Sequence, residues 1–168
     1  MKLTVDRDRI TGKIKPMNAV NNGPVYTENA DQNDTNLYYY RDAGIPYART
    51  HDASICYDYG GEHTVDIINI FTDFDADPYD PASYDFSLTD MYLNNIRLAG
   101  TKTFFRLGNK IEHWPKHYGI VPPKDAKKWA VICEHIIRHY NEGWADGFSM
   151  DIEYWEIWNE HDFNGKCW

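Results

Sequence analysis

Runs of apolar and β-branched residues alternate with helix-like stretches along this chain. Residues 102–107 read KTFFRL, a short segment rich in β-branched and aromatic side chains, as is typical of a strand. Residues 124–141 instead place apolar side chains three and four positions apart, which gathers them on one face of a helix. That face consists of Trp129, Ile132, Cys133, Ile136, Ile137 and Tyr140. The alternation predicts successive βα units around a parallel sheet.

Four such units can be traced. The predicted strands are residues 15–20, 47–51, 102–107 and 152–159, and the predicted helices are residues 35–43, 88–99 and 124–141. Ser87 is the expected N-cap of the second helix, with Asp90 three residues on in an approximate capping box. An apolar run at residues 65–71 falls within the loop after the second strand. Turn residues close the first strand, namely Asn21, Asn22, Gly23 and Pro24.

Two of the predicted connections are unusually long. The loops after the second and third strands exceed the length usual in βα units. In (β/α)8 barrels, the loops at the carboxyl ends of the strands build the active site. We therefore expect the functional residues at this edge of the sheet. The 168 residues suffice for one domain or part of one, but fall short of the roughly 250 residues of a full barrel.

Composition narrows the classes of function. Hydrophobic residues make up 42% of the chain, yet no apolar run approaches the roughly 20 residues of a membrane helix. The segment MKLTVDRDRITGKIKP lacks the apolar stretch of a secretory signal, so a cytoplasmic protein is favoured. The net charge of -9 stays negative even with all seven histidines protonated, which argues against a nucleic-acid partner. Cys56, Cys133 and Cys167 lack metal or redox spacing and are expected to be free thiols.

Candidate chemistry is concentrated in the segment WEIWNE, residues 155–160, at the end of the fourth predicted strand. Hydrolysis of a glycosidic bond needs a carboxylic acid that protonates the leaving oxygen and a second carboxylate across the sugar ring. Glu160 is the candidate acid, and the amide of Asn159 is a candidate to hold the 2-hydroxyl of the sugar. An Asn-Glu pair alone is common, but at the end of an apolar strand flanked by tryptophans it is a specific signal.

These residues carry a resemblance to a known family. WEIWNE resembles the fourth-strand signature of retaining glycosidases built on (β/α)8 barrels, in which the glutamate of the Asn-Glu pair is the acid/base. Other segments resemble the corresponding stretches of glycoside hydrolase family 39, which contains β-xylosidases and α-L-iduronidases: GKIKPMNAVNNGP, YARTHDA, SYDFSLTDMYLNNIRLAG and PPKDAKKW. The resemblance implies that residues 1–168 form the N-terminal half of one catalytic (β/α)8 barrel domain.

The same resemblance implies a mechanism. A retaining exo-glycosidase of the β-xylosidase kind would use Glu160 as its acid/base on an oligosaccharide or glycoside, without a metal or cofactor. The family places its nucleophile glutamate on the seventh strand, beyond these four units, so the chain by itself is expected to be inactive. Unpaired outer strands and an uncovered inner face are also expected to promote self-association.

Strand periodicity indicates which other side chains face the site. Glu156, Trp158 and Glu160 share a parity, so Glu156 points into the barrel interior if Glu160 points into its mouth. Arg49 and His51 share a face of the second strand in the same way. The resemblance implies that the arginine and the histidine contact the nucleophile and the sugar. The alternative is that Arg49 only neutralises Glu156 and that His51 is a core histidine.

An interior carboxylate also needs a cation, and we expect Glu156 to pair with Arg49 or with Arg106 on the third strand. Three tryptophans are candidate sugar platforms: Trp114, Trp155 and Trp158. Trp155 has the opposite parity to Glu160, so it is expected to pack against the helices. The partly exposed inner face of the sheet is expected to include Trp158.

Three alternative functions rest on other residues. Glu134, His135 and His139 suggest a zinc hydrolase, but zincins need the glutamate directly after the first histidine, and both histidines are expected on the solvated side of their helix. The acidic loop 73–77 suggests calcium, but lacks the glycine and glutamate of an EF-hand and is expected to be solvated. A non-catalytic carbohydrate-binding fragment is the third alternative, because the second carboxylate lies outside the four units.

Overall fold

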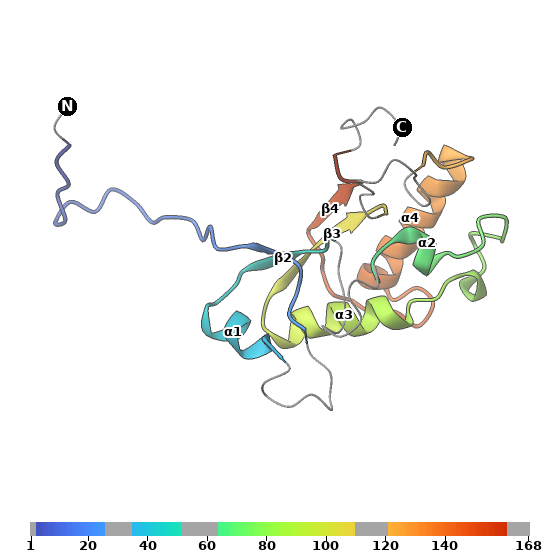
Figure 1. Ribbon diagram of the computed structural model, residues 1–168, viewed down its shortest axis with the longest axis horizontal. Helices are drawn as coiled ribbons and strands as arrows, with labels where there is room; N and C mark the ends of the chain where they lie inside the picture. Colours follow the sequence, from blue (N-terminus) through green and yellow to red (C-terminus); the bar gives the residue numbers. More distant parts are fainter. Residues whose placement is uncertain (1–2, 26–34, 52–63, 110–120, 161–168) are drawn as a thin grey trace, which may run out of the picture.

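The computed structural model describes residues 3–25, 35–51, 64–109 and 121–160 (Figure 1). Four parallel strands form one sheet in the order β1 (Val20–Asn21), β2 (Tyr47–Arg49), β3 (Lys102–Leu107) and β4 (Tyr154–Ile157). The helices between them are α1 (Leu37–Asp42), α2 (Ile67–Ile70), the short 3₁₀ helix η2 (Pro81–Ser83), α3 (Ser87–Leu98) and α4 (Ala126–Glu142). The alternation matches half of a (β/α)8 barrel and confirms the predicted fold class.

One face of the sheet is covered by α3 and α4, which lie on the same side of it in Figure 1. Phe105 of β3 is fully buried, and its ring centroid lies 5.7 Å from that of Tyr140 in α4. Helix α3 contributes Leu93 and Ile96, also fully buried, at the three-residue spacing of one helix face. Burial of these apolar groups holds the helices against the strands.

The opposite face carries aromatic side chains that converge on one another. The ring centroid of Tyr154 in β4 lies 5.5 Å from that of Tyr47 in β2 and 5.6 Å from that of Phe104 in β3. Tyr154 remains 47% exposed, and Tyr47 and Phe104 are half-buried. This face therefore presents an accessible aromatic surface.

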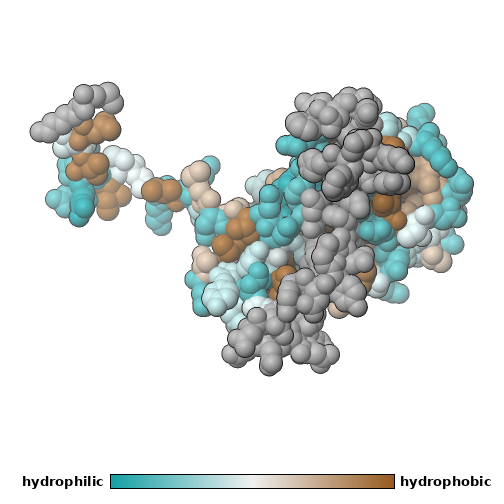
Figure 2. Space-filling model, in the orientation of Figure 1, coloured by the Kyte–Doolittle hydropathy of each residue, from teal (hydrophilic) through white to brown (hydrophobic). Residues whose placement is uncertain are grey.

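The first strand is shorter than predicted, and the predicted strand at residues 15–20 is wrong for most of its length. Residues 3–19 have no regular secondary structure, and every one of them is exposed. Figure 1 shows this segment leading away from the body of the fold, and the space-filling view shows hydrophobic residues along it (Figure 2). Ile14 and Met17, 90% and 86% exposed, have no packing surface, and Pro16 has no N–H to give to a ladder. Strands β2 and β4 also end two residues earlier than predicted.

The start of α3 differs from the expected capping box. Ser87 is the first residue of α3 and not its N-cap, and the Oδ1 atom of Asp85 accepts hydrogen bonds from the N–H and the hydroxyl of Ser87 at 3.0 and 2.6 Å. These bonds lower the pKa of the Asp85 carboxyl. Asp90 instead ties α3 to α4, because its Oδ1 lies 3.1 Å from His139 Nε2 and 2.9 Å from Tyr140 Oη.

Helix α4 confirms the predicted apolar face, which is buried from Trp129 to Tyr140. Asp125 caps the helix by accepting from the N–H groups of Lys127 and Lys128. The expectation that His135 and His139 are solvated is wrong, since they are 3% and 2% exposed. Contacts with neighbouring aromatic rings enclose them, including a stacked Phe86 with its centroid 3.6 Å from that of His139.

The apolar run at residues 65–71, predicted to lie within a loop, contains a helical turn, α2, whose Ile67 and Ile70 are buried. Cys133, the cysteine that falls within the described residues, is buried with a free thiol. Within that same part of the chain, no cluster of three or more His, Cys, Asp or Glu could hold a metal ion. No helix there is long and apolar enough to cross a membrane.

Candidate active site

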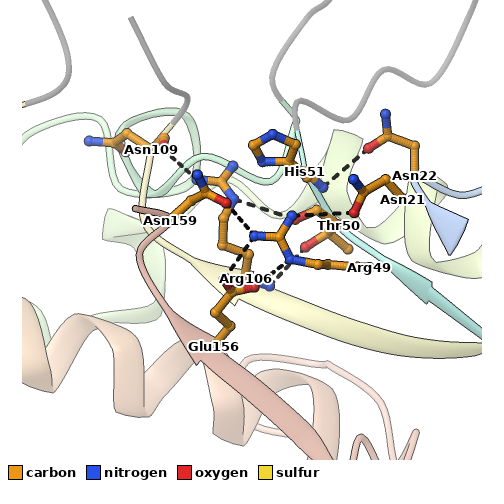
Figure 3. A network of polar contacts seen from close by, with 9 residues as sticks. All are labelled: Asn21, Asn22, Arg49, Thr50, His51, Arg106, Asn109, Glu156 and Asn159. Atoms are coloured by element: carbon orange, nitrogen blue, oxygen red, sulfur yellow. Dashed lines mark hydrogen bonds and ion pairs between the residues drawn. The ribbon is translucent and has the colours of Figure 1, made fainter. Parts of the chain in front are cut away.

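Arg49, the last residue of β2, lies at the centre of a polar network at the carboxyl edge of the sheet (Figure 3). Its Nε and Nη2 atoms donate to the two carboxylate oxygens of Glu156 at 2.6 and 2.8 Å. Its Nη1 donates to Asn21 Oδ1 at 3.3 Å, and its Nη2 also donates to Asn159 Oδ1. One guanidinium therefore joins β1, β2 and β4 across β3.

The pairing of Glu156 with Arg49 confirms one of the two expected partners. Both side chains are partly shielded, at 28% and 23% exposure, on the face that strand parity predicted. Both carboxylate oxygens accept from the same planar guanidinium, a geometry that fixes the orientation of each group. Glu156 thus serves as the counter-ion that holds Arg49 in place.

Arg106, the other expected partner, pairs with a different carboxylate. Its Nη2 lies 2.9 Å from Asp66 Oδ1, and the two side chains are 0% and 1% exposed. Its backbone N–H donates to Thr50 Oγ1 at 2.9 Å, and its Nη1 donates to the carbonyl oxygen of Asn109. The sequence reasoning missed Asp66. Its position inside the apolar run 65–71 could have indicated this pair, because a carboxylate buried in a hydrophobic core needs a cation as its partner.

The segment after β4 breaks the alternation of the strand. Trp158 and Glu160 have φ angles of 63° and 45°, in the left-handed region. Trp158 is 1% exposed, and its ring centroid lies 5.9 Å from that of Trp129 in α4. The expectation that Trp158 stays partly exposed beside Glu156 is wrong, because the turn sends its ring into the helix layer. The role of Trp158 as a sugar platform stays a prediction.

Gly108 permits this turn. Its φ angle is 149°, and a Cβ atom at this position would lie 3.0 Å from Trp158 Cα and 3.2 Å from the indole ring. The N–H of Trp158 donates to the carbonyl oxygen of Leu107 at 2.6 Å, which continues the ladder by one residue. The close approach of Gly108 to Trp158 fixes where Asn159 and Glu160 leave the sheet.

Glu160 follows three residues after β4 and is exposed, whereas Asn159 beside it is half-buried. Glu160 is therefore not enclosed among the helices. Trp155 packs as expected, with its ring centroid 5.1 Å from that of the fully buried Phe105. Trp114 lies outside the described residues.

His51 is half-buried at the same edge, and Asn22 holds its backbone. The N–H of His51 donates to Asn22 Oδ1 at 3.2 Å, and the N–H of Asn22 donates to the carbonyl oxygen of Arg49 at 2.7 Å. Asn22 adopts a φ of 64°, which asparagine tolerates better than most residues. The sequence pattern predicts Asn21 and Asn22 as turn residues alone. Their place directly after the strand predicted at residues 15–20, at the edge where barrels build their sites, was the available signal.

The end of β1 is anchored to α3 through Gly23. Its N–H donates to Tyr92 Oη at 2.5 Å, and a Cβ on Gly23 would lie 2.4 Å from Ile96 Cγ1. Burial raises the pKa of Tyr92, so its hydroxyl stays neutral. Val20, Asn21 and Arg49 line an open groove of about 370 Å³ with Ala19, Tyr47 and Phe104.

No protein-family model matches this chain, and no curated protein matches it. Among solved structures, the chain is similar to a glucosidase from Croceicoccus marinus, with 27% sequence identity and a TM-score of 0.69. The match covers 90% of this chain and 29% of the glucosidase chain, so this chain spans less than a third of that enzyme's length. Together with the four-stranded parallel sheet, this similarity shows that the chain has a glycosidase-like fold.

Proposed function

We propose that this chain carries the acid/base portion of a retaining glycoside hydrolase, with Glu160 as the acid/base. The observation that supports the proposal is the position of Asn159 and Glu160. They follow β4 at the carboxyl edge of the sheet, and Arg49 of β2 binds the carbonyl oxygen of Asn159. Active sites of (β/α)8 enzymes lie at this edge. Residues 1–168 would then belong to one barrel domain of the kind found in family 39.

Glu160 would act twice in such a reaction. It first donates a proton to the glycosidic oxygen while a nucleophilic carboxylate about 5–5.5 Å away attacks the anomeric carbon. It then removes a proton from the water that releases the sugar. We assign Glu156 the role of counter-ion to Arg49, because both of its oxygens accept from that guanidinium. The resemblance to family 39 assigns that role to a glutamate on a seventh strand.

Arg49, His51 and Asn159 are the proposed substrate-binding residues. Asn159 turns its carbonyl oxygen toward Arg49, so its amide NH2 is directed elsewhere and can donate to a sugar hydroxyl. The resemblance to family 39 favours a β-xyloside as the substrate. The similar solved structure is that of a glucosidase, so measurements of specificity should compare a β-xyloside with a β-glucoside.

The acid role can be tested by supplying the nucleophile from solution. Azide would attack the anomeric carbon of phenyl β-xyloside, the C–O bond would break, and phenol would leave with the proton of Glu160. We expect phenol release that depends on azide and is lost in Glu160→Gln. The same assay with phenyl β-glucoside in place of phenyl β-xyloside shows which sugar is preferred. Glu142→Gln, at an exposed carboxylate of α4, is the matched control. Equal release by Glu160→Gln would contradict the acid assignment, and xyloside binding without any release would favour a binding fragment.

We also propose that copies of this chain associate with one another. Strands β1 and β4 form the two edges of the described sheet, and edge strands carry unpaired backbone groups. Ile157 of β4 is 52% exposed and Tyr154 47%. Because all strands are parallel, the β4 edge of one copy can pair with the β1 edge of another. Light scattering across a concentration series should show an average mass above that of one chain, and a constant monomer mass would contradict this proposal.

A further inference from the structure

Three asparagine side chains at the carboxyl edge share one orientation, which follows from their partners. Asn21 and Asn159 face the guanidinium of Arg49, and Asn22 faces the backbone N–H of His51. A guanidinium or an N–H can only donate, so each asparagine must turn its carbonyl oxygen toward that partner. The amide NH2 groups are then directed away from these partners (Figure 3).

Among these three asparagines, Asn21 is the most accessible to a ligand from solvent. It is exposed, and with Arg49 it lines the open groove of about 370 Å³ whose walls include the rings of Tyr47 and Phe104. Arg49 fixes the carbonyl oxygen of Asn21 as it fixes that of Asn159, so both amides are oriented before any ligand arrives. Oriented donors beside aromatic surface suit a ligand with hydroxyl oxygens on one side and C–H groups on the other. A sugar ring has both.

We propose that Asn21 is a substrate-binding residue, whose side-chain amide donates to a hydroxyl oxygen of the sugar held at Asn159. The assignment rests on the proposed glycosidase function and extends it to β1. Arg49 positions both amides, so the two hydroxyl contacts are set by one side chain. The sugar then contacts the ends of β1 and β4 together.

The amide signals of the 168-residue chain test this directly. In ¹⁵N-labelled protein titrated with methyl β-D-xyloside, we expect the Asn21 side-chain NH2 signals to shift along the same binding curve as the rest of the site. Asn21→Ala should bind this xyloside about tenfold more weakly, as loss of one well-placed hydrogen bond predicts. Asn94→Ala is the matched control, because Arg97 Nη2 donates to Asn94 Oδ1 at 2.8 Å on α3, outside the site. Its affinity should equal that of the wild type.

The possible outcomes distinguish the role of Asn21 from the proposed glycosidase function on which it rests. Wild-type binding with unmoved Asn21 signals and an unchanged affinity in Asn21→Ala would overturn the role of Asn21 and leave the glycosidase proposal standing. Absence of xyloside binding by the wild type would overturn both. Because the signal shift is measured in the wild type, the test holds even if Asn21→Ala folds poorly.

Discussion

Arg106 Nη2 lies 2.9 Å from Asp66 Oδ1, with neither side chain more than 1% exposed, whereas the Arg49–Glu156 pair is about a quarter exposed. Two ion pairs of the same chemistry therefore lie in different solvent environments. Water screens the second pair in part and the first hardly at all. Their contributions to stability should differ accordingly.

Asp66→Asn should destabilise the fold by about 3–5 kcal/mol, because it leaves a buried guanidinium without its counter-charge. Urea unfolding followed by circular dichroism measures this change. Glu142→Gln removes the exposed pair with Arg138 on α4 and should cost about 0–0.5 kcal/mol. Similar losses for the two variants would show that the Arg106–Asp66 pair is not buried as described.

Glu156→Gln should cost about 1–3 kcal/mol, less than Asp66→Asn, because water reaches the Arg49–Glu156 pair. Arg49→Lys should also lose stability, since an ammonium cannot form the two parallel hydrogen bonds. The double variant Arg49→Met with Glu156→Met should lose less than the sum of the losses of Arg49→Met and Glu156→Met made singly, because no unpaired charge remains. Additive losses in urea unfolding would contradict a direct pair.

Gly108→Ala should be more destabilising than Gly44→Ala. Both positions have positive φ angles, 149° and 58°, so an added side chain is strained at each. At Gly108 the new Cβ also meets Trp158 at 3.0 Å, whereas at Gly44 nothing lies within 4 Å. The excess cost of crowding is about 1–3 kcal/mol. Tryptophan fluorescence should report displacement of Trp158 in the first variant alone.

Asp85 predicts a pH-dependent contribution to stability. Its pKa is lowered in the folded chain by the two bonds from Ser87, so the carboxylate stabilises the fold above its ordinary pKa of 3.8. As the pH falls through the lowered folded pKa, that contribution disappears. Asp85→Ala should therefore be less stable than the wild type at neutral pH, and the difference should shrink as the pH falls through the lowered pKa, because the protonated carboxyl accepts more weakly. Asp85→Asn, which retains a neutral acceptor at every pH, is the control, and a difference between Asp85→Ala and the wild type that does not change with pH would contradict the assignment.

Much of the architecture follows from the sequence, because it depends on local patterns. The segment KTFFRL forms β3 over the predicted residues, and the apolar face of α4 is buried as its spacing predicted. The parity of Glu156 and Arg49 placed them on one face, and the Asn-Glu pair follows β4 as its motif indicated. Spacing along a strand or helix fixes which side chains share a face without reference to the rest of the chain.

Tertiary structure decided the choices that depend on distant partners. Arg49 and Arg106 were equal candidates for Glu156 in the sequence, and only the fold brought Asp66 to Arg106. Local spacing predicts a rigid alternation, but the close approach of Gly108 allows a left-handed turn at Trp158, whose ring lies near Trp129 of α4. Asn21 gained its place in the network in the same way, through a guanidinium 28 residues away. Such contacts depend on three-dimensional proximity, which the order of residues does not encode locally.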